Sequence, residues 1–357
     1  MPLRLAIVAE QLFQAVPGGS GRYIEELTRA FDADVRALGI TATASGSRSR
    51  LPLRPARLPR QILYPLWNAG RGPRPETIAP GGDVVHATTW AIPPTSLPLA
   101  VTIHDLAFLD DPTQFTARGN RFFRRALQRA AHRADAIIVP SHVTAEACAR
   151  QGIDERLIHV IPHGVTVVSG AADDVEAFRT RHGLGREPYL LWCGTFEPRK
   201  NLAGVIGAFA LVPPETHLVL AGPVGWGDAG LAALEDLPAS ARERVHIVGR
   251  LSDRDLAAAY AGAEMFLFPS HREGFGLPVL ESMAYGTPVV STAGSPMQEF
   301  GTGAGAFVGT SPAQIAEGIT EVSARRDAYA AAARQIATRY TWKAAARAHA
   351  DVYRSIA

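Results

Sequence analysis

The sequence has few of the features that mark secreted, membrane-spanning or metal-holding proteins. Its two cysteines, Cys148 and Cys193, lie far apart and provide neither a disulfide framework nor a pair of zinc ligands, which favours a reducing compartment. No run of about 20 apolar residues is present to span a membrane. The first apolar run meets Glu10 too early for a signal peptide. We therefore expect a cytoplasmic protein.

The chain as a whole also carries no large excess of positive or negative charge. The 357 residues are 47% apolar and 20% charged, with a net charge of +2, which is an ordinary balance for a globular protein. We therefore expect no nucleic-acid partner. The length suffices for two domains with sizeable cores.

Residues 268–292, FPSHREGFGLPVLESMAYGTPVVST, predict a strand, a glycine loop, a helix and a second strand. A loop with Gly274 and Gly276 before a helix offers backbone N–H groups and the positive helix end, which together suit phosphate. Glu273 and Glu281 flank this site and suit hydroxyls. The pattern predicts a ligand with hydroxyls on both sides of its phosphates, such as a nucleotide sugar. The alternative is an ordinary α/β connection with two structural or solvated carboxylates.

A second segment, GTFEPRKN, follows a buried strand at 189–193 and precedes a helix from Leu202. Arg199 and Lys200 thus lie at a helix start, where the dipole disfavours cations, so an anion should compensate for their charge. A pyrophosphate does so, because arginine binds it bidentately and lysine acts as a point charge. Glu197 either contacts the same ligand or only holds Arg199 in place.

Residues 3–31 predict a strand, a Pro-Gly-Gly loop and a helix from Arg22 to Phe31, the opening of a doubly wound α/β domain. The glycines are spaced wrongly for a dinucleotide site. A later strand, 99–103, ends at His104 and Asp105, where α/β sheets place their ligands. His104 is either a ligand contact or a structural histidine, and Asp105 either orients its imidazole or caps the following turn.

Two segments are rich in arginine. Residues 45–79 carry seven arginines, several prolines and one acid, which predicts an irregular connection. It either binds an anionic acceptor or lipid headgroup, or is a solvated loop. Residues 116–133 predict a basic amphipathic helix. The segment Arg118–Arg133 either lies on an anionic membrane, at its inner face, or belongs to a surface helix whose aromatics pack on the sheet. Residues 169–187 are polar and small, which is typical of a hinge.

The sequence motifs around these residues resemble those of one family. E-G-F-G-L-P-V-L-E, with seven residues between Glu273 and Glu281, closely resembles the signature of retaining nucleotide-sugar glycosyltransferases of family 4. GTFEPRKN resembles the diphosphate-binding segment of that family, and HATTWAIPP with TIHDL resembles its mannosyltransferase-like branch. IPHGV resembles a Pro-Asn-Gly-Val turn of the family, but His163 replaces the usual Asn. The resemblance covers essentially the whole chain except residues 45–80.

The resemblance implies an α/β chain with two Rossmann-like domains facing each other across a cleft, the GT-B arrangement. Residues 1–168 would form the N-terminal acceptor domain and 169–340 the C-terminal donor domain. Residues 341–357 would form a helix that crosses back to the N-terminal domain, where Trp342 and Tyr353 would pack.

The resemblance also implies roles for single residues. His104 and Glu273 would position the donor sugar, Glu281 would hold the ribose, and Arg199 and Lys200 would stabilise the departing diphosphate. The further donor contacts that it implies are Gly19, Glu197, Leu251, Gly274, Phe275, Gly276 and Leu277.

The implied activity is a metal-independent, retaining glycosyl transfer with no resident cofactor. An α-mannosyl group would move from GDP-mannose to a hydroxyl of an oligosaccharide, polysaccharide or glycolipid, with UDP-glucose as the rival donor. Two other classes stay open, a nucleotide-sugar epimerase and a catalytically silent nucleotide-sugar-binding subunit. The acceptor, the base of the donor and the oligomeric state do not follow from these residues.

Overall fold

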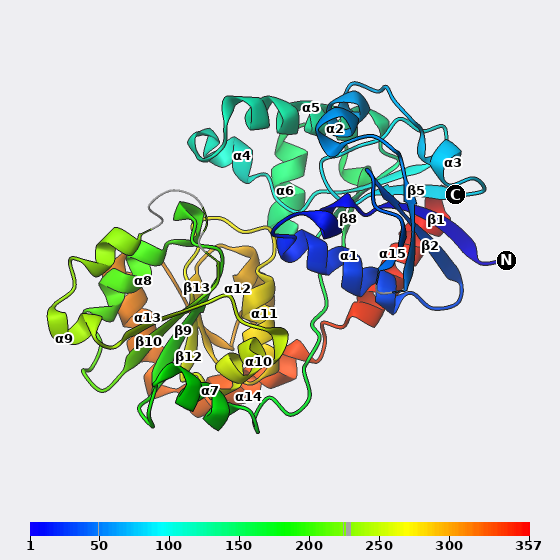
Figure 1. Cartoon of the computed structure of the whole chain (residues 1–357). Helices are drawn as coiled ribbons and strands as arrows, with labels where there is room; N and C mark the ends of the chain where they lie inside the picture. The colour runs from blue at the N-terminus through cyan, green and yellow to red at the C-terminus, as the bar shows by residue number, and fades with distance from the viewer. Residues whose placement is uncertain (49, 224, 226–229) are drawn as a thin grey trace. The chain divides into compact units, whose positions relative to one another are not determined.

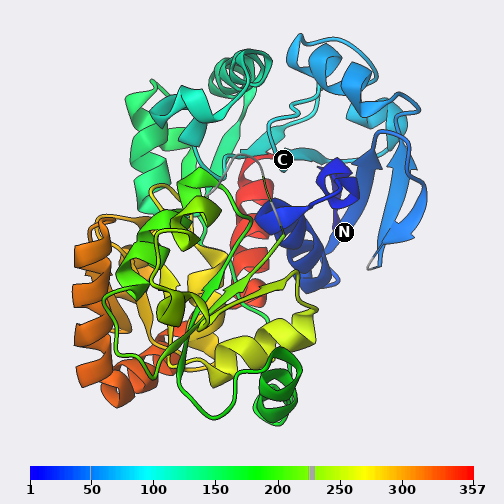
Figure 2. The same ribbon diagram turned by 60° about the vertical axis from the view of Figure 1, so that its left-hand side comes forward.

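A computed structural model describes residues 1–48, 50–223, 225 and 230–357 of the chain. These residues form two compact units (Figures 1 and 2). Unit 1 comprises residues 1–164 and 341–357, and unit 2 comprises residues 165–340. The division therefore falls at Gly164–Val165, whereas the sequence predicts a boundary after residue 168.

Unit 1 is built on an eight-stranded sheet with the order β3-β4-β2-β1-β5-β6-β7-β8. Short apolar runs form its central strands, so that every residue of β5, β6 and β7 is buried. Only the pairing of β3 with β4 is antiparallel. The strand order reverses between β1 and β5, as in doubly wound folds. The strands are β1 (Leu3–Val8), β2 (Val35–Thr41), β3 (Gly46–Arg48), β4 (Leu51–Pro55), β5 (Val84–Ala87), β6 (Leu99–Thr102), β7 (Ala136–Val139) and β8 (Ile158–Val160).

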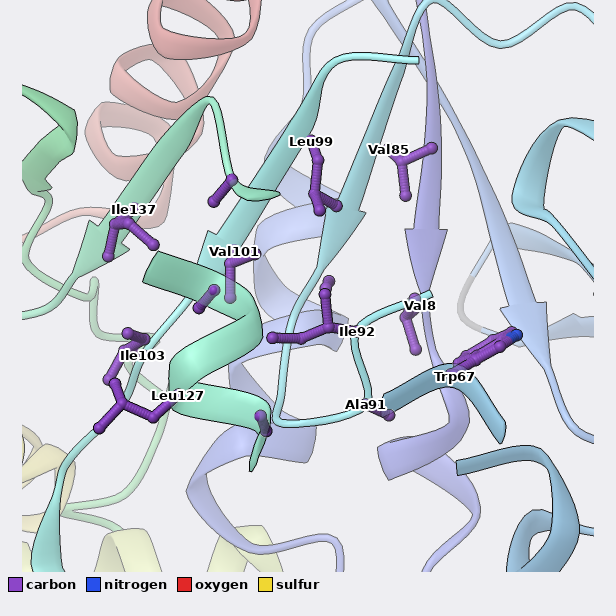
Figure 3. Packing of buried hydrophobic residues seen from close by; sticks show 14 of the residues in the cluster. Val8, Trp67, Val85, Ala91, Ile92, Leu99, Val101, Ile103, Leu127 and Ile137 are labelled. Atoms are coloured by element: carbon purple, nitrogen blue, oxygen red, sulfur yellow. The ribbon is translucent and has the colours of Figure 1, made fainter. Parts of the chain in front are cut away.

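Helices cover this sheet and close its core. Figure 3 shows two side chains from different helices packed in this core, Trp67 beside Val8 of β1 and Leu127 beside Ile103, which follows β6. The helical segments of unit 1 are η1 (Glu10–Phe13), α1 (Gly18–Ala30), α2 (Arg60–Asn68), α3 (Pro75–Ile78), α4 (Ala107–Asp110), η2 (Pro112–Gln114), α5 (Ala117–Arg133), α6 (His142–Arg150), η3 (Glu155–Leu157) and α15 (Trp342–Ile356).

The prediction of an irregular connection at 45–79 is wrong. Leu51 and Leu53 of β4 are buried and alternate with exposed residues, and β4 pairs in parallel with β2. Residues 60–68 form α2, which buries Leu63 and Trp67. Position 49 lies outside the described residues. The period-two alternation is the signal for β4, and the nearby prolines obscure it because proline is rare within sheets.

Two other boundaries differ from the predictions. Helix α1 begins at Gly18 rather than at Arg22, and the Gly21 amide already donates to the Pro17 carbonyl at 3.0 Å, so Gly19 lies in the first turn of the helix. The predicted hinge at 169–187 contains a helix, α7 (Val175–His182), whose C-cap residue, Gly183, has the left-handed conformation. A glycine in that conformation is a common helix terminator.

Unit 2 is built on a six-stranded, wholly parallel sheet with the order β11-β10-β9-β12-β13-β14. Its strand order reverses between β9 and β12, which are hydrogen-bonded neighbours. A parallel sheet covered on both faces needs strands that are continuously apolar, and β12 (MFLF) is entirely buried. The strands are β9 (Tyr189–Cys193), β10 (His217–Ala221), β11 (Val245–Gly249), β12 (Met265–Phe268), β13 (Val289–Thr292) and β14 (Gly305–Val308).

The helices of unit 2 connect these strands. Their buried side chains meet Leu190, Trp192 and Leu267 of the sheet in one core. The helical segments are α7 (Val175–His182), η4 (Pro198–Lys200), α8 (Leu202–Phe209), η5 (Leu231–Leu234), α9 (Ala239–Arg242), α10 (Asp253–Gly262), α11 (Leu277–Ala284), α12 (Pro296–Gly301), α13 (Pro312–Ala324) and α14 (Arg326–Ala337). Over the described part of the chain, no helix combines the length and the apolar character needed to cross a bilayer.

The last helix, α15, belongs to unit 1, as the family resemblance implies. Figures 1 and 2 both show it beside α1. Trp342 and Tyr353 of α15 are buried, at 6% and 0% exposure. In addition to these apolar contacts, a buried network of hydrogen bonds joins α15 to the rest of unit 1.

The direction of each hydrogen bond in this network follows from the contact of His349 with the Ala345 carbonyl. His349 Nδ1 lies 2.8 Å from the Ala345 carbonyl, which can only accept, so Nε2 of the neutral ring accepts from the Tyr23 hydroxyl at 2.7 Å. Tyr23 then accepts from Thr102 at 3.0 Å, and Thr102 accepts from His86 Nε2 at 2.7 Å. His86 Nδ1 accepts from Tyr353 at 2.8 Å. Every member is satisfied only while both histidines are neutral.

Burial enforces this neutral state. It lowers the pKa of His349 to about 4 and lowers the pKa of His86 well below its ordinary value. Above a pH of about 6.5, histidines are neutral in the folded and in the unfolded chain. As the pH falls below that value, the unfolded chain takes up protons that the folded chain excludes. The free energy of unfolding of unit 1 should therefore fall between pH 7 and pH 4.

The contribution of His349 can be isolated by substitution. We expect His349→Gln to reduce stability at pH 7 and to make the decline of the free energy of unfolding between pH 7 and pH 5 shallower. Urea denaturation at several pH values measures both effects. His132→Gln, on the exposed side of α5, is the control and should leave the decline unchanged. An unaltered pH dependence in His349→Gln would contradict the assignment.

Candidate functional site

The candidate site lies where the sheet of unit 2 reverses its strand order. Ligands of open α/β sheets bind outside the carboxyl ends of the strands at such a point. Strand β9 leads into residues 194–201 and β12 into residues 269–276. The two segments are joined by hydrogen bonds, because the His271 amide donates to the Arg199 carbonyl at 2.9 Å and Asn201 Nδ2 donates to the Pro269 carbonyl at 3.0 Å.

Four charged side chains from these segments form one cluster. Lys200 Nζ donates to Glu273 Oε1 at 2.5 Å, and Arg199 Nη1 lies 3.0 Å from the same oxygen. Arg199 also pairs with Glu197, with 3.4 Å between Nη2 and Oε2, and donates to the Arg272 carbonyl at 2.9 Å. The structure thus brings Glu197, Arg199, Lys200 and Glu273 together. The two cations that the sequence places at a helix start lie against two carboxylates.

Burial makes the electrostatics of this cluster strong. The side chains of Lys200 and Glu273 are 12% and 10% exposed. Burial lowers the pKa of Lys200, and the charge of Glu273 opposes this only in part. Burial alone would raise the pKa of Glu273, but Lys200 and Arg199 bring that pKa below its ordinary value. Glu273 is therefore a carboxylate at neutral pH. Lys200 also lies over the Phe268 ring, 4.8 Å from its centroid.

Glu281 occupies a separate position on α11. It is 8% exposed, and its Oε2 accepts a hydrogen bond from the Tyr260 hydroxyl at 3.2 Å. Cys193 ends β9 nearby. Burial raises the pKa of its thiol to about 12, and the charge of Glu281 adds to that effect. Glu281 therefore faces the carboxyl end of β9, on the same edge of the sheet as the charged cluster.

The start of α11 is shaped by Gly276. This residue has a φ of +95°, and a Cβ placed on it would lie 2.4 Å from Met297 Cγ, so only glycine fits. Next to it, Phe275 is 5% exposed and its ring packs on Phe300 at 4.9 Å. Gly274 and Leu277 complete the turn. This packing fixes the direction of the first N–H groups of α11, which have no partner within the helix.

Leu251 follows β11 and is half-buried at the same edge of the sheet, two strands from β9. The turns after β9, β10 and β11 meet closely. The Gly222 amide donates to the Gly249 carbonyl at 2.8 Å, and a Cβ on Gly222 would lie 1.9 Å from the Gly194 oxygen. A glycine at 222 therefore lets these turns pack side by side.

His104 and Gly19 belong to unit 1, whereas all other predicted site residues belong to unit 2. His104 Nε2 donates to the Thr88 carbonyl at 3.1 Å, which leaves Nδ1 as the acceptor nitrogen of the neutral ring. Burial lowers the pKa of His104. Asp105 Oδ1 accepts from the Ala107 amide at 3.1 Å, so it caps the turn that follows.

Sequence reasoning missed Asn201 and Tyr260. Asn201 has a φ of 55°, its Oδ1 accepts from the Gly204 amide at the start of α8, and its Nδ2 holds the β12 segment. Asparagine directly before a helix is a usable signal, because it is a favoured N-cap residue. Tyr260 lies in an alanine-rich stretch of α10, and nothing in the local sequence indicates its contact with Glu281.

No group of three or more His, Cys, Asp or Glu side chains that could hold a metal ion occurs within the described residues. The absence of a metal requirement stays a prediction.

Comparisons with known proteins give the family. The family described as Glycosyltransferase Family 4 matches residues 17–168, and Glycosyl transferases group 1 matches residues 174–339. The O-antigen chain mannosyltransferase B of Escherichia coli is 29% identical over 215 residues, which cover 58% of this chain and 56% of that protein. The chain thus matches about half the length of this relative.

A D-inositol 3-phosphate glycosyltransferase of Xylanimonas cellulosilytica is 30% identical over 299 residues, which cover 76% of this chain and 71% of that protein. Among solved structures, Anabaena HepE in complex with UDP-glucose is 19% identical and has a TM-score of 0.77 over 99% of this chain and 100% of that one. This likeness shows the fold, an α/β architecture with two parallel-sheet units. The chain therefore belongs to the family 4 glycosyltransferases.

Proposed function

We propose that this protein transfers a sugar from a nucleoside diphosphate donor to a hydroxyl, with retention of the anomeric configuration. The observation that carries the proposal is the partly buried cluster of Arg199, Lys200 and Glu273 at the reversal point of the unit 2 sheet. Two adjacent cations suit a diphosphate, and a carboxylate suits the hydroxyls of a sugar. A requirement for an acceptor would exclude a nucleotide-sugar epimerase, whereas donor binding without transfer or hydrolysis would instead support a silent binding subunit.

GDP-mannose is the donor that we propose first. The HATTWAIPP and TIHDL resemblance and the likeness to the Escherichia coli mannosyltransferase support it. UDP-glucose is the second candidate, because HepE, which shares the fold, has a solved complex with it. The acceptor that we propose is a carbohydrate or glycolipid hydroxyl.

The cluster suggests how the chain would promote loss of the diphosphate. Negative charge grows on the leaving group as the glycosidic bond breaks. Arg199 and Lys200 would stabilise this charge from fixed positions, and the N–H groups at Gly276 and Leu277 would assist them, as would Gly19. Such preorganised charge stabilisation is commonly the largest catalytic contribution.

Glu273 would bind the sugar rather than attack it. Both of its ion pairs use Oε1, so Oε2 has acceptor capacity for sugar hydroxyls. The leaving phosphate would then take the proton of the acceptor hydroxyl, on the face that the diphosphate leaves. Glu197 would hold Arg199 in place through their ion pair.

The remaining predicted residues receive roles on the same basis. Glu281 would accept hydrogen bonds from the ribose, with Tyr260 fixing its carboxylate. Leu251, Gly274 and Phe275 would line the nucleotide. His104 would contact the donor sugar through Nδ1, because Nε2 is held by Thr88. Both cysteines are free thiols, which is in keeping with the cytoplasmic location that we propose.

Removal of either member of the central ion pair should slow the reaction. We expect Lys200→Ala to lower kcat roughly 100-fold or more, the loss found when one transition-state donor is removed. Glu273→Ala should also lower kcat strongly, because it removes the acceptor for the sugar hydroxyls. The readout is the rate of GDP release from GDP-mannose, with mannoside acceptors and with water alone. Glu273→Gln keeps the side-chain volume, and it should share the loss of rate while leaving Lys200 less exposed to solvent than the alanine variant does.

Arg254→Ala provides the control for those variants. It breaks a 2.6 Å ion pair of unit 2 with Asp174, in which the arginine side chain is 73% exposed. Its turnover should equal that of the wild type. Near-normal turnover in Lys200→Ala or Glu273→Gln would remove the role assigned to that residue.

Donor choice can be measured by thermal unfolding with GDP, UDP, ADP and their sugar conjugates in the presence of EDTA. A ligand at a hundredfold excess over Kd stabilises the folded state by roughly 2.7 kcal/mol. We expect GDP and GDP-mannose to raise the Tm and the other nucleotides and conjugates to leave it unchanged. A shift with UDP instead would keep the mechanism and overturn the mannosyl donor. No shift with any nucleotide would contradict the nucleotide site itself.

His104 requires its own measurement because it belongs to unit 1. We expect His104→Ala to lower kcat by about 10-fold or more while GDP binding, measured by calorimetry, stays at the wild-type level. The loss follows from the missing contact with the sugar, since the proposed nucleotide contacts other than Gly19 lie in unit 2. Equal loss of GDP affinity and of rate would show that the substitution acts on the fold instead.

A further inference from the structure

Helix α5 of unit 1 carries a continuous cationic stripe. Successive residues of a helix are rotated by about 100°, so positions 118, 121, 125 and 129 lie along one side. The opposite side buries Ala126, Leu127 and Ala130. The arginines of this helix are Arg118, Arg121, Arg124, Arg125, Arg129 and Arg133, and all except Arg129 are exposed. Within the described residues, none of the six forms an ion pair with a carboxylate.

The neighbouring helix, α2, carries an apolar stripe. The two helices contact each other, with the rings of Tyr64 and Phe122 stacked at 6.3 Å, and Figures 1 and 2 both show them side by side. On α2, Ile62 is 51% exposed although it is a large apolar residue. Pro65 and Ala69 are exposed too, and they follow Ile62 at helical spacing. We call the two stripes together the α2–α5 face.

The charge of the chain is divided between the units. Unit 1 has 22 lysines and arginines against 15 acids, a net charge of +7, whereas unit 2 has 14 against 19, a net charge of −5. Several arginines of unit 1 outside the α2–α5 face are paired with acids, such as Arg4 with Asp83 and Arg354 with Asp34. The α2–α5 face therefore holds much of the uncompensated positive charge.

We propose that the α2–α5 face docks on an anionic lipid bilayer. Cationic side chains beside exposed apolar side chains are the combination by which a helix lies at a membrane interface. The arginines complement anionic headgroups, and Ile62 with Pro65 reaches the acyl boundary. A purely electrostatic partner, such as a soluble polyanion, would leave the apolar stripe without a role. The proposal concerns the surface of unit 1 and goes beyond the proposed activity.

The test uses the full chain and vesicle sedimentation. Wild-type protein should sediment with phosphatidylcholine vesicles that contain roughly one third phosphatidylglycerol, and not with phosphatidylcholine alone, with binding that weakens as salt is raised. Each arginine near such a surface contributes about fivefold to partition. The triple variant Arg118→Ala, Arg121→Ala, Arg125→Ala should therefore lose about a hundredfold. Ile62→Ser should lower partition without changing its salt dependence.

A matched control separates this face from net charge. The triple variant Arg150→Ala, Arg156→Ala, Arg347→Ala removes three exposed arginines of unit 1 that lie outside α2 and α5. It should bind anionic vesicles much more tightly than the α5 variant. Equal loss in both triple variants, or binding to neutral vesicles as strong as to anionic ones, would overturn the proposal. So would wild-type binding to heparin without binding to anionic vesicles. GDP binding should be unchanged in every variant, which keeps this test apart from the donor site.

Discussion

The contact between Lys200 and Glu273 is the constraint on which the geometry of unit 2 depends. One buried carboxylate oxygen meets an ammonium group from the segment after β9 and a guanidinium group from the same segment, while the carboxylate itself comes from the segment after β12. Removing either partner would leave a buried charge, which is among the costliest defects in a protein interior. The two segments are therefore held at one separation by charge, by Asn201 and by backbone hydrogen bonds.

The strand order explains why Lys200 and Glu273 meet although they are 73 residues apart in the sequence. A parallel sheet brings the carboxyl ends of its strands to one edge, and the reversal of strand order between β9 and β12 opens a position between their following segments. Gly276 and Gly222 allow turns to approach where any side chain would collide. The tight turns and the charged cluster are thus two results of the same strand order.

The sequence predicts this architecture well where residues have one physical use. Glycine beside proline at a helix start, adjacent cations and fully apolar strands each have few alternative explanations, so the fold class, the two sheets and the segments around Glu273 and Arg199 can be predicted.

The sequence predicts the structure poorly where a local pattern is ambiguous. Leu51 and Leu53 alternate as in a strand, but the prolines around them favour a loop, and only pairing with β2 decides between the two. The contact of Tyr260 with Glu281 joins two helices and leaves no local signal. Likewise, the helix start predicts that Arg199 and Lys200 need an anion, but only the tertiary structure shows that carboxylates of the same chain pair with them.

Helix α15 has a consequence for how the protein is made. Unit 2 is one continuous stretch of chain, but unit 1 is interrupted by it, and the partners of Tyr23 and His86 lie in α15, which is synthesised after unit 2. Domains tend to fold as units while the chain is being produced. On the ribosome, unit 2 can therefore finish before unit 1, although unit 1 emerges first. Until α15 has been synthesised, the Tyr23 hydroxyl and the His86 imidazole lack their partners in that helix and are exposed to water. Unit 1 therefore stays incompletely folded while unit 2 can already be folded.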